Sequence, residues 1–149
     1  MAPDGKEVLR AGGFLVYRPV KGSFEYLYLR SSKPSKHWSP TKGHVDPGED
    51  EREAAVRETK EEVGLTPDAL KIDDTFEQTV FYNYQNDPNK PKTIKWWLAE
   101  FADNNTKIKL SKEHSEFKWV PLEEAIKIAS FDAMEPFMRS AEKYLKSKR

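Results

Sequence analysis

The chain has 149 residues, contains no cysteine, and carries 25 basic and 25 acidic residues, so its formal net charge is zero. A general nucleic-acid-binding protein needs a basic excess, so this balance argues against a stable nucleic-acid partner. The length suits a single domain over residues 1–149 that needs no disulfide. Because no apolar run resembles a signal peptide or a membrane span, we expect a cytoplasmic protein, with the nucleus as the alternative location. A monomer is expected as a separate prediction, which no sequence pattern supports.

The N-terminal part is predicted to form a β-hairpin followed by a loop. Residues 8–18 and 24–30 are rich in Val, Leu, Tyr and Phe, which favour strands, and residues 21–23 supply the turn. The glycine pair at 12–13 indicates a bulge or a close approach of another backbone. Residues 31–42 contain two prolines and are predicted to be a loop that leads into an acidic segment.

The acidic segment, residues 43–65, is predicted to contain a turn and one helix. Residues 46–48 read Asp-Pro-Gly and bend the backbone, residues 49–63 favour a helix, and Gly64 is a typical residue just past a helix end. At about 100° per residue, Glu58, Glu61 and Glu62 fall on one stripe of this helix. The opposite side is suited to packing on a sheet and carries Arg52, Ala55, Val56, Thr59 and Val63.

The three carboxylates of this stripe indicate a metal site. Like charges on neighbouring helical positions repel one another, which destabilises the helix. A hard cation such as Mg²⁺ removes the repulsion, because it takes oxygen ligands from carboxylates and from substrate phosphates. Without further pattern the same glutamates would be read as a solvated acidic helix.

The C-terminal part is predicted to alternate strands with helices. Strands are expected at residues 69–74, 76–84, 93–101 and 117–120, with a turn at 86–89 and helices at 122–129 and 133–144. In the strand at residues 93–101, the side chains of Ile94, Trp96 and Leu98 share one face, and that of Trp97 lies on the other. Asp132 is the expected N-cap of the last helix. Strands interspersed with helices imply a mixed β-sheet flanked by helices.

The acidic segment resembles a known motif. Its fixed residues are spaced as in the Nudix box, G-x5-E-x7-R-E-U-x-E-E-x-G-U, and are Gly43, Glu49, Arg57, Glu58, Glu61, Glu62, Gly64 and Leu65. Thr59 departs from it, since the motif has a bulky aliphatic residue there. The resemblance implies an α/β/α sandwich of the Nudix type and hydrolysis of a nucleoside diphosphate linked to another group. It also implies that Glu58, Glu61 and Glu62 hold Mg²⁺, for which Mn²⁺ can substitute, and that Arg57 pairs with Glu49 as a brace.

Segments outside the box are similar to the asymmetric diadenosine tetraphosphate hydrolases of the animal and archaeal type. They read HWSPTKGHVDPGED, FEQTVFYNYQNDPNKPKTIKWWLAEF and LSKEHSEFKWVPLEEA. Thr41 stands where that family has a second proline before Lys-Gly-His. The resemblance implies a nucleotide substrate, ATP and AMP as products, and a polyphosphate site and box loop with His37, Lys42, Gly43, Lys90 and Lys92. It places adenine-stacking rings at Tyr82 and Phe131, and a general base or metal ligand at Glu113.

Alternatives remain at this stage. Taken alone, Phe131 is as well explained by core packing, and Glu113 would be an ordinary loop residue. A Nudix hydrolase acting on a diphosphoinositol polyphosphate, capped RNA or an oxidised nucleotide would share the box. A non-catalytic nucleotide-binding Nudix module would be expected to lose box carboxylates, all of which are present here.

Overall fold

The computed structural model describes residues 8–34, 36–83, 87–102, 105–129 and 132–148. Its strands are β1 (Leu9–Val20), β2 (Ser23–Ser31), β3 (Trp38–Ser39), β4 (Thr41–His44), β5 (Leu70–Asn83), β6 (Pro91–Phe101) and β7 (His114–Val120). Its helices are α1 (Glu51–Val63), the short 3-10 helix η1 (Pro67–Ala69), α2 (Leu122–Ile128) and α3 (Met134–Ser147). None of the helices in these described ranges is long and apolar enough to cross a membrane.

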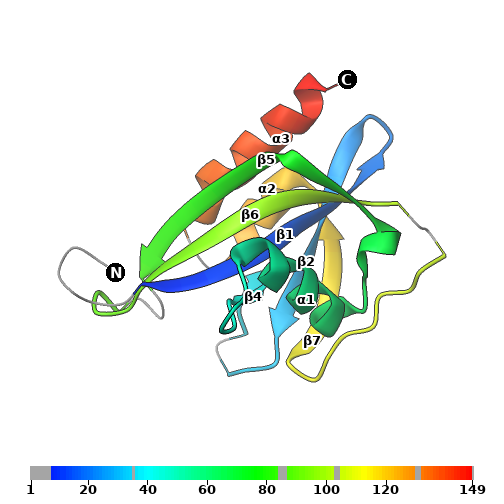
Figure 1. Ribbon diagram of the computed structural model, residues 1–149. Coiled ribbons are helices and arrows are strands. Elements are labelled where there is room, and N and C mark those ends of the chain that lie inside the picture. Colours follow the sequence, from blue (N-terminus) through cyan, green and yellow to red (C-terminus); the bar gives the residue numbers. More distant parts are fainter. Residues whose placement is uncertain (1–7, 35, 84–86, 103–104, 130–131, 149) are drawn as a thin grey trace.

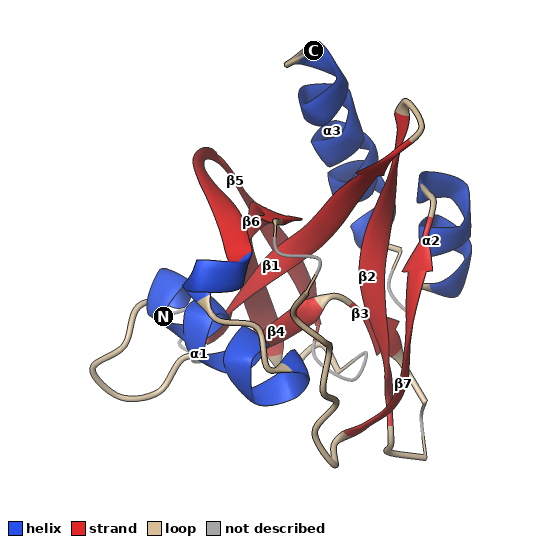
Figure 2. Cartoon of the chain, turned by 90° about the vertical axis from the view of Figure 1, so that its right-hand side faces the viewer, coloured by secondary structure: helices blue, strands red, loops and turns tan. Residues whose placement is uncertain are grey.

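The strands form one mixed sheet. Its main order is β3-β2-β1-β6-β5, with β4 paired to β1 and β7 paired to β2. The β1–β6 pair is parallel, whereas the other pairs are antiparallel. Helix α1 covers one face, while α2 and α3 lie on the other (Figures 1 and 2). This arrangement confirms the predicted mixed sheet flanked by helices.

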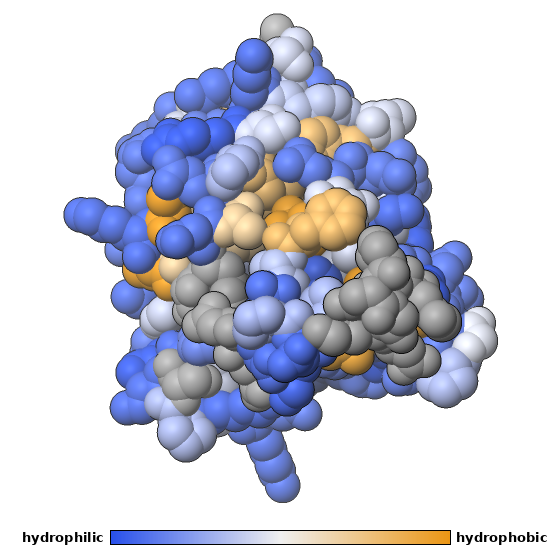
Figure 3. All heavy atoms as spheres, turned by 90° about the vertical axis from the view of Figure 1, so that its left-hand side faces the viewer, coloured by the Kyte–Doolittle hydropathy of each residue, from blue (hydrophilic) through white to orange (hydrophobic). Residues whose placement is uncertain are grey.

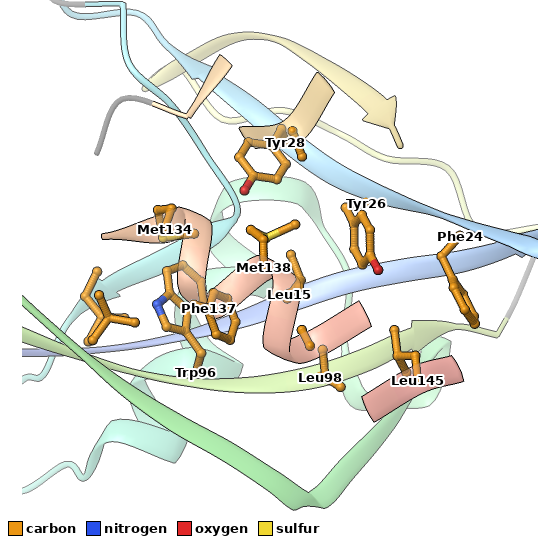
Figure 4. Packing of buried hydrophobic residues seen from close by; sticks show 14 of the residues in the cluster. Leu15, Phe24, Tyr26, Tyr28, Trp96, Leu98, Met134, Phe137, Met138 and Leu145 are labelled. Atoms are coloured by element: carbon orange, nitrogen blue, oxygen red, sulfur yellow. The ribbon is translucent and has the colours of Figure 1, made fainter. Parts of the chain in front are cut away.

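A separate apolar core fills each side of the sheet. On the α2 and α3 side, Trp96 stacks on Phe137 with ring centroids 5.4 Å apart, and both side chains are fully buried (Figure 4). On the α1 side, Phe14 contacts Trp97 edge-on at 6.4 Å. The face of the molecule shown in Figure 3 is mostly hydrophilic, with hydrophobic residues near its centre. As predicted, the two faces of β6 serve different cores.

The first hairpin and the glycine pair follow the sequence prediction. Lys21 and Gly22 both have positive φ angles, 46° and 82°, which suits a tight two-residue turn between Val20 and Ser23. A side chain at Gly12 would overlap the backbone carbonyl of Glu51, the first residue of α1. The glycine pair therefore marks a close backbone approach that lets α1 begin directly against β1.

Two strand predictions were wrong. The predicted loop at residues 31–42 contains β3 and the start of β4, which are too short to show an alternating pattern but pair with β2 and β1. The two strands predicted at 69–74 and 76–84 are one strand, β5, with a bulge between Asp73 and Glu77. Asp73 accepts hydrogen bonds there from the backbone and hydroxyl of Thr75, so a local bend was read as a break.

Three helix-end predictions were also wrong. Helix α1 begins at Glu51 rather than at residue 49, because Asp50 caps it. Helix α3 begins at Met134 after Ala133, and Asp132 provides no side-chain cap. The same helix continues to Ser147, three residues beyond the predicted end at residue 144.

Candidate active site

Helix α1 presents the acidic residues, and both of its ends are fixed locally. The Asp50 carboxylate accepts the Glu53 N–H at 2.8 Å, while the Glu53 carboxylate accepts the Asp50 N–H at 3.0 Å. Such a reciprocal pair satisfies two N–H groups that have no partner within the helix. Gly64 ends the helix with φ 75°, a left-handed conformation that glycine adopts without strain. Glu49 is therefore left outside the helix, in the loop before it.

An ion pair connects this loop to the helix. The Arg57 guanidinium donates two hydrogen bonds to the Glu49 carboxylate, at 2.8 and 2.9 Å. It donates a third, at 2.9 Å, to the backbone carbonyl of His44 at the end of β4. The bond from Arg57 is the main reason why the pKa of Glu49 is lowered to about 2. The predicted Arg57–Glu49 pair is thus present, and it joins β4, the loop and α1.

The three stripe glutamates differ in burial. The Glu61 side chain is 56% exposed, that of Glu58 is 17% exposed, and Glu62 as a residue is only 8% exposed. The Lys42 backbone N–H donates to Glu62 Oε1 at 3.1 Å. The expectation of an acidic stripe opposite the packing face is therefore only partly right, because Glu62 faces β4.

Burial perturbs the two inner carboxylates. Desolvation is the main cause that raises the pKa of Glu58 to about 7, and a side-chain hydrogen bond to Glu61 is the next contribution. Desolvation also raises the pKa of Glu62 to about 8, against the attraction of the Lys42 ammonium. Perturbed carboxylates of this kind are a recognised feature of functional sites.

Gly43 makes room for one of these carboxylates. A β-carbon built at Gly43 would overlap the carboxylate of Glu58. The glycine that opens the box is therefore required by packing, since any side chain would displace Glu58. Through this contact β4 and α1 together position the acidic group, which consists of Glu58, Glu61 and Glu62.

Glu113 reaches the same site from a distant part of the chain. The Ser111 N–H donates to the Glu62 carbonyl at 3.1 Å, and the Ser32 N–H donates to the Glu113 carbonyl at 2.8 Å. The first bond attaches the segment before β7 to the end of α1, and the second attaches it to the residues after β2. The negative charge of Glu113 contributes to the raised pKa of both Glu58 and Glu62. The structure thus brings Glu113 to the acidic group, as the family resemblance implied.

Cationic side chains gather beside the acidic group. Lys92 is 3% exposed, and its ammonium lies 5.6 Å from the centre of the Tyr82 ring on the neighbouring strand. Desolvation, followed by repulsion from Lys42 and Lys33, lowers the pKa of Lys92 to about 7. The pKa of His44 is lowered by desolvation and by the same lysines together with Lys92. These mutual effects indicate one cationic group near the carboxylates.

Two residues at this place, the cationic Lys33 and the neutral His44, were missed by the sequence reasoning. His44 stands in the quoted Lys-Gly-His segment, so its place next to Gly43 was a usable signal. Lys33 lies in the segment predicted as a loop, and only its effect on the pKa of Lys42, His44 and Lys92 reveals it. No signal in the sequence singled it out.

For the remaining predicted residues, His37, Lys90 and Phe131, the structure gives at most the position of the backbone. The His37 carbonyl accepts the Ser31 N–H at 2.8 Å beside β3, which fixes its backbone near the end of β2. Lys90 is exposed in the turn before β6, where its N–H donates to the Asp87 carbonyl at 2.9 Å. Phe131 lies outside the described residues. The roles of these three residues in substrate binding stay predictions.

Comparison with known proteins identifies the family. A family model described as the NUDIX domain matches residues 8–141. The chain belongs to the Nudix family. It is 45% identical over 138 residues to the asymmetrical bis(5'-nucleosyl)-tetraphosphatase of Caenorhabditis elegans, with 93% of this chain and 97% of the relative covered. It is 39% identical over 143 residues to the Mus musculus enzyme of the same name, with 92% and 95% covered.

A solved structure agrees with this assignment. The crystal structure of a Caenorhabditis elegans Ap4A hydrolase binary complex matches with a TM-score of 0.87 and 44% identity, and the match covers 94% of this chain and 99% of that one. A more distant Nudix relative, the RNA pyrophosphohydrolase of Roseobacter denitrificans, is 30% identical over 125 residues, 72% of this chain and 78% of that protein. The Nudix sandwich predicted from the sequence is thereby confirmed.

Nudix hydrolases generally need a divalent metal ion, so the acidic group can be tested for its fit. Among the described residues, no three carboxylate or imidazole side chains are already arranged to hold a metal. Arg57 Nη1 instead bridges Glu58 and Glu61 at 3.2 and 3.3 Å. Nevertheless the donor set suits a hard cation, since it offers carboxylate oxygens, and desolvation together with neighbouring carboxylates disfavours their ionised form without a cation. A divalent ion would stabilise their ionised form and replace the weak Arg57 contacts.

Proposed function

We propose that this Nudix protein hydrolyses diadenosine tetraphosphate asymmetrically, to ATP and AMP. The observation that carries this proposal is the 45% identity over 97% of the length of a relative named for that activity. Identity confined to the box would support only the reaction class, because different Nudix enzymes share the box. Here the match extends over nearly the whole chain, so it includes the strands that carry Tyr82 and Lys92.

The acidic group would hold Mg²⁺, with Mn²⁺ as a substitute. Glu58, Glu61 and Glu62 supply the ligand oxygens from α1, and Glu113 supplies another from the segment before β7. A bound divalent ion lowers the pKa of water and neutralises charge on the leaving phosphate. Arg57 and Glu49 keep the loop and helix in a fixed relation, so that α1 would stay in place while the ion replaces the contacts of Arg57 with Glu58 and Glu61.

Proton removal falls to a carboxylate of this chain. Glu62 and Glu113 are the two candidates for the general base, because both carboxylates lie at the acidic group. Glu62 is buried, whereas Glu113 is exposed. Attack at the phosphate next to one adenosine then releases AMP, with ATP as the other product.

The cationic group would bind the polyphosphate. Lys42 of β4 and Lys92 of β6 would contact it, and His37 and Lys90 are proposed to contact it as well. Cations that face developing negative charge are usually the largest contribution to catalysis. The Tyr82 ring would stack on an adenine, which is worth about 1–3 kcal/mol per base, and Phe131 would provide the second ring.

Product analysis tests the substrate assignment. The protein is incubated with Mg²⁺ and diadenosine tetraphosphate, and the products are separated by ion-exchange chromatography. ATP and AMP in equal amounts are expected. Two ADP molecules would contradict asymmetric cleavage. Diphosphoinositol polyphosphates, capped RNA and triphosphorylated RNA are tested as alternative substrates. Release of pyrophosphate from triphosphorylated RNA without turnover of diadenosine tetraphosphate would favour the activity named for the Roseobacter denitrificans relative.

A pair of variants tests the role of Glu113. Glu113→Gln should lower kcat, because it removes a carboxylate from the acidic group. Glu116→Gln is the matched control. Glu116 lies three residues after Glu113, on β7, and forms an ion pair with Arg30 at 3.6 Å instead. Equal kcat values for both variants would show that Glu113 takes no part in the reaction.

We further propose that the protein acts as a monomer without a stable nucleic-acid partner. The equal numbers of basic and acidic residues support the second part. Size-exclusion chromatography with light scattering tests the first part, and a dimer mass would contradict it.

A further inference from the structure

Two buried threonines join β4 to helix α1. Thr41 is 0% exposed and Thr59 is 1% exposed, and their hydroxyl oxygens are 2.8 Å apart. The Thr41 hydroxyl donates to the Phe14 carbonyl of β1 at 3.2 Å. A hydroxyl has one proton to donate, so Thr59 must be the donor to Thr41. A directed chain of hydrogen bonds therefore runs from α1 through β4 to β1.

This pair coincides with the two departures noted in the sequence. Thr59 stands where the box has a bulky aliphatic residue, and Thr41 stands where the related hydrolases have proline. A buried hydroxyl without a partner costs about 1–3 kcal/mol, so Thr59 would be unfavourable at its position without Thr41. Thr41 keeps its own bond to the Phe14 carbonyl and accepts the Thr59 proton, so it supplies the partner that Thr59 needs.

The neighbours of the pair are the residues of the acidic group. Lys42 follows Thr41 and donates its backbone N–H to Glu62, which lies one helical turn after Thr59. Gly43 comes next and lies directly against the Glu58 carboxylate. Three consecutive residues of β4 thus contact three residues on one side of α1.

We propose that the Thr41–Thr59 hydroxyl pair is a positioning device for the active site. It fixes the separation and register of β4 and α1, so that the Lys42 N–H meets Glu62 and Gly43 leaves the right space for Glu58. A purely apolar contact at this place would hold the two elements together but would not set their register, because dispersion contacts are not directional. The inference rests on the proposed function, since it assigns the pair to the residues that carry out that reaction.

The test compares Thr59→Val, Thr59→Ser and the double variant Thr41→Val/Thr59→Val. Thr59→Val removes the donor and keeps the shape, and we expect kcat on diadenosine tetraphosphate to fall roughly tenfold with KM within about twofold, because a displacement near 1 Å can cost about a hundredfold. Thr59→Ser retains the hydroxyl and should keep kcat near the wild-type value. In the double variant both polar partners are replaced by apolar ones, so the melting temperature should return towards that of the wild type. If the pair positions the site, kcat stays low in the double variant.

A second measurement needs neither metal nor substrate. Amide hydrogen exchange of the metal-free protein, followed by NMR, reports whether the Lys42 N–H is still bonded to Glu62. Exchange at Lys42 should be at least about tenfold faster in Thr59→Val and in the double variant, and unchanged in Thr59→Ser. If Thr41→Val/Thr59→Val fails to fold, the comparison of Val with Ser at position 59 decides the question alone.

Tyr26→Phe is the matched control. It also removes one buried hydroxyl, which donates to Glu142 at 2.9 Å on the opposite side of the sheet. It should lower the melting temperature without changing kcat or the Lys42 exchange rate. Wild-type protein that does not cleave diadenosine tetraphosphate would refute the proposed function, and Lys42 exchange would still judge the pair. A kcat that recovers with stability in the double variant, or unchanged Lys42 exchange in Thr59→Val, would overturn the positioning role.

Discussion

Replacing Glu62 by Gln should make the metal-free protein more stable while it disables the enzyme. Glu62 is 8% exposed, and desolvation raises its pKa from 4.5 to about 8. The folded protein therefore holds this proton to a higher pH than the unfolded chain does. Between pH 4.5 and about 8 the folded state binds more protons, so the free energy of unfolding falls as the pH rises. Gln has no proton to lose, and the variant escapes this loss.

The size of the effect follows from the pKa shift. Each pKa unit corresponds to about 1.36 kcal/mol, so the loss amounts to about 2 kcal/mol at pH 6 and about 4 kcal/mol at pH 8. Relaxation of protein and water around a buried charge reduces such penalties. We therefore expect Glu62→Gln to raise the free energy of unfolding by about 1 kcal/mol at pH 6 and about 2 kcal/mol at pH 8. For a chain of this size, the larger value corresponds to about 4–8 °C in Tm.

Urea unfolding in EDTA at pH 5, 6, 7 and 8 measures this difference. Glu61→Gln is the matched control, because it makes the same chemical change on the same helix at a side chain that is 56% exposed. Exposed charges contribute little to stability, so the control should depart from the wild type by less than Glu62→Gln at every pH, through the effect of Glu61 on Glu58. A clearly larger rise with pH for Glu62→Gln than for Glu61→Gln supports the burial argument.

The same variant should lose activity. Removal of one ligand charge and one candidate base should reduce kcat with Mg²⁺ by several powers of ten, on the order of 10³-fold or more. Residues that serve function at the expense of stability commonly show this opposition. If Glu62→Gln were less stable than the wild type at pH 8 in EDTA, or kept most of its activity, the assignment of Glu62 would be refuted.

Three further predictions concern the ion and the substrate. Millimolar Mg²⁺ should raise the Tm of the wild type at pH 8 relative to EDTA, because a ligand that binds only the folded state stabilises it; equal midpoints would contradict the metal site. Tyr82→Ala should raise KM more than it lowers kcat, since stacking is equal in the ground and transition states, while Phe81→Ala, at a residue 73% exposed, should change neither. Lys92→Met should mainly lower kcat in steady-state kinetics, whereas Lys95→Met, which removes a lysine paired with Glu77, should not; a pure KM effect at Lys92 would argue against contact with developing charge.

Local sequence patterns determined the helix and the faces of the sheet. The end of α1 at Gly64 and the alternation of Trp96 and Trp97 between two cores follow from backbone preference and side-chain periodicity, which act within a few residues. The Arg57–Glu49 pair was predictable from the box for a similar reason, since only a turn and two helical turns separate its members. The start of α1 was harder to predict than its end, because Glu49 and Asp50 are adjacent acidic residues and only the structure shows that Asp50 is the N-cap.

The tertiary structure decided which charges share the site. Glu113 is 51 residues from Glu62 in the sequence, and the bond between Ser111 and the Glu62 carbonyl brings it there. Lys33 joins the cationic group only because the segment after β2 folds back beside Lys42. No periodicity connects such distant positions.

Burial was likewise decided by packing. Glu61 and Glu62 are adjacent and chemically identical, yet one is exposed and the other faces β4 with its pKa raised to about 8. The hydroxyls of Thr41 and Thr59 could be seen as departures from a pattern, but their contact could not. Residue type and spacing determine which chemistry a chain can offer, whereas desolvation and directed hydrogen bonds depend on neighbours that only the folded chain supplies.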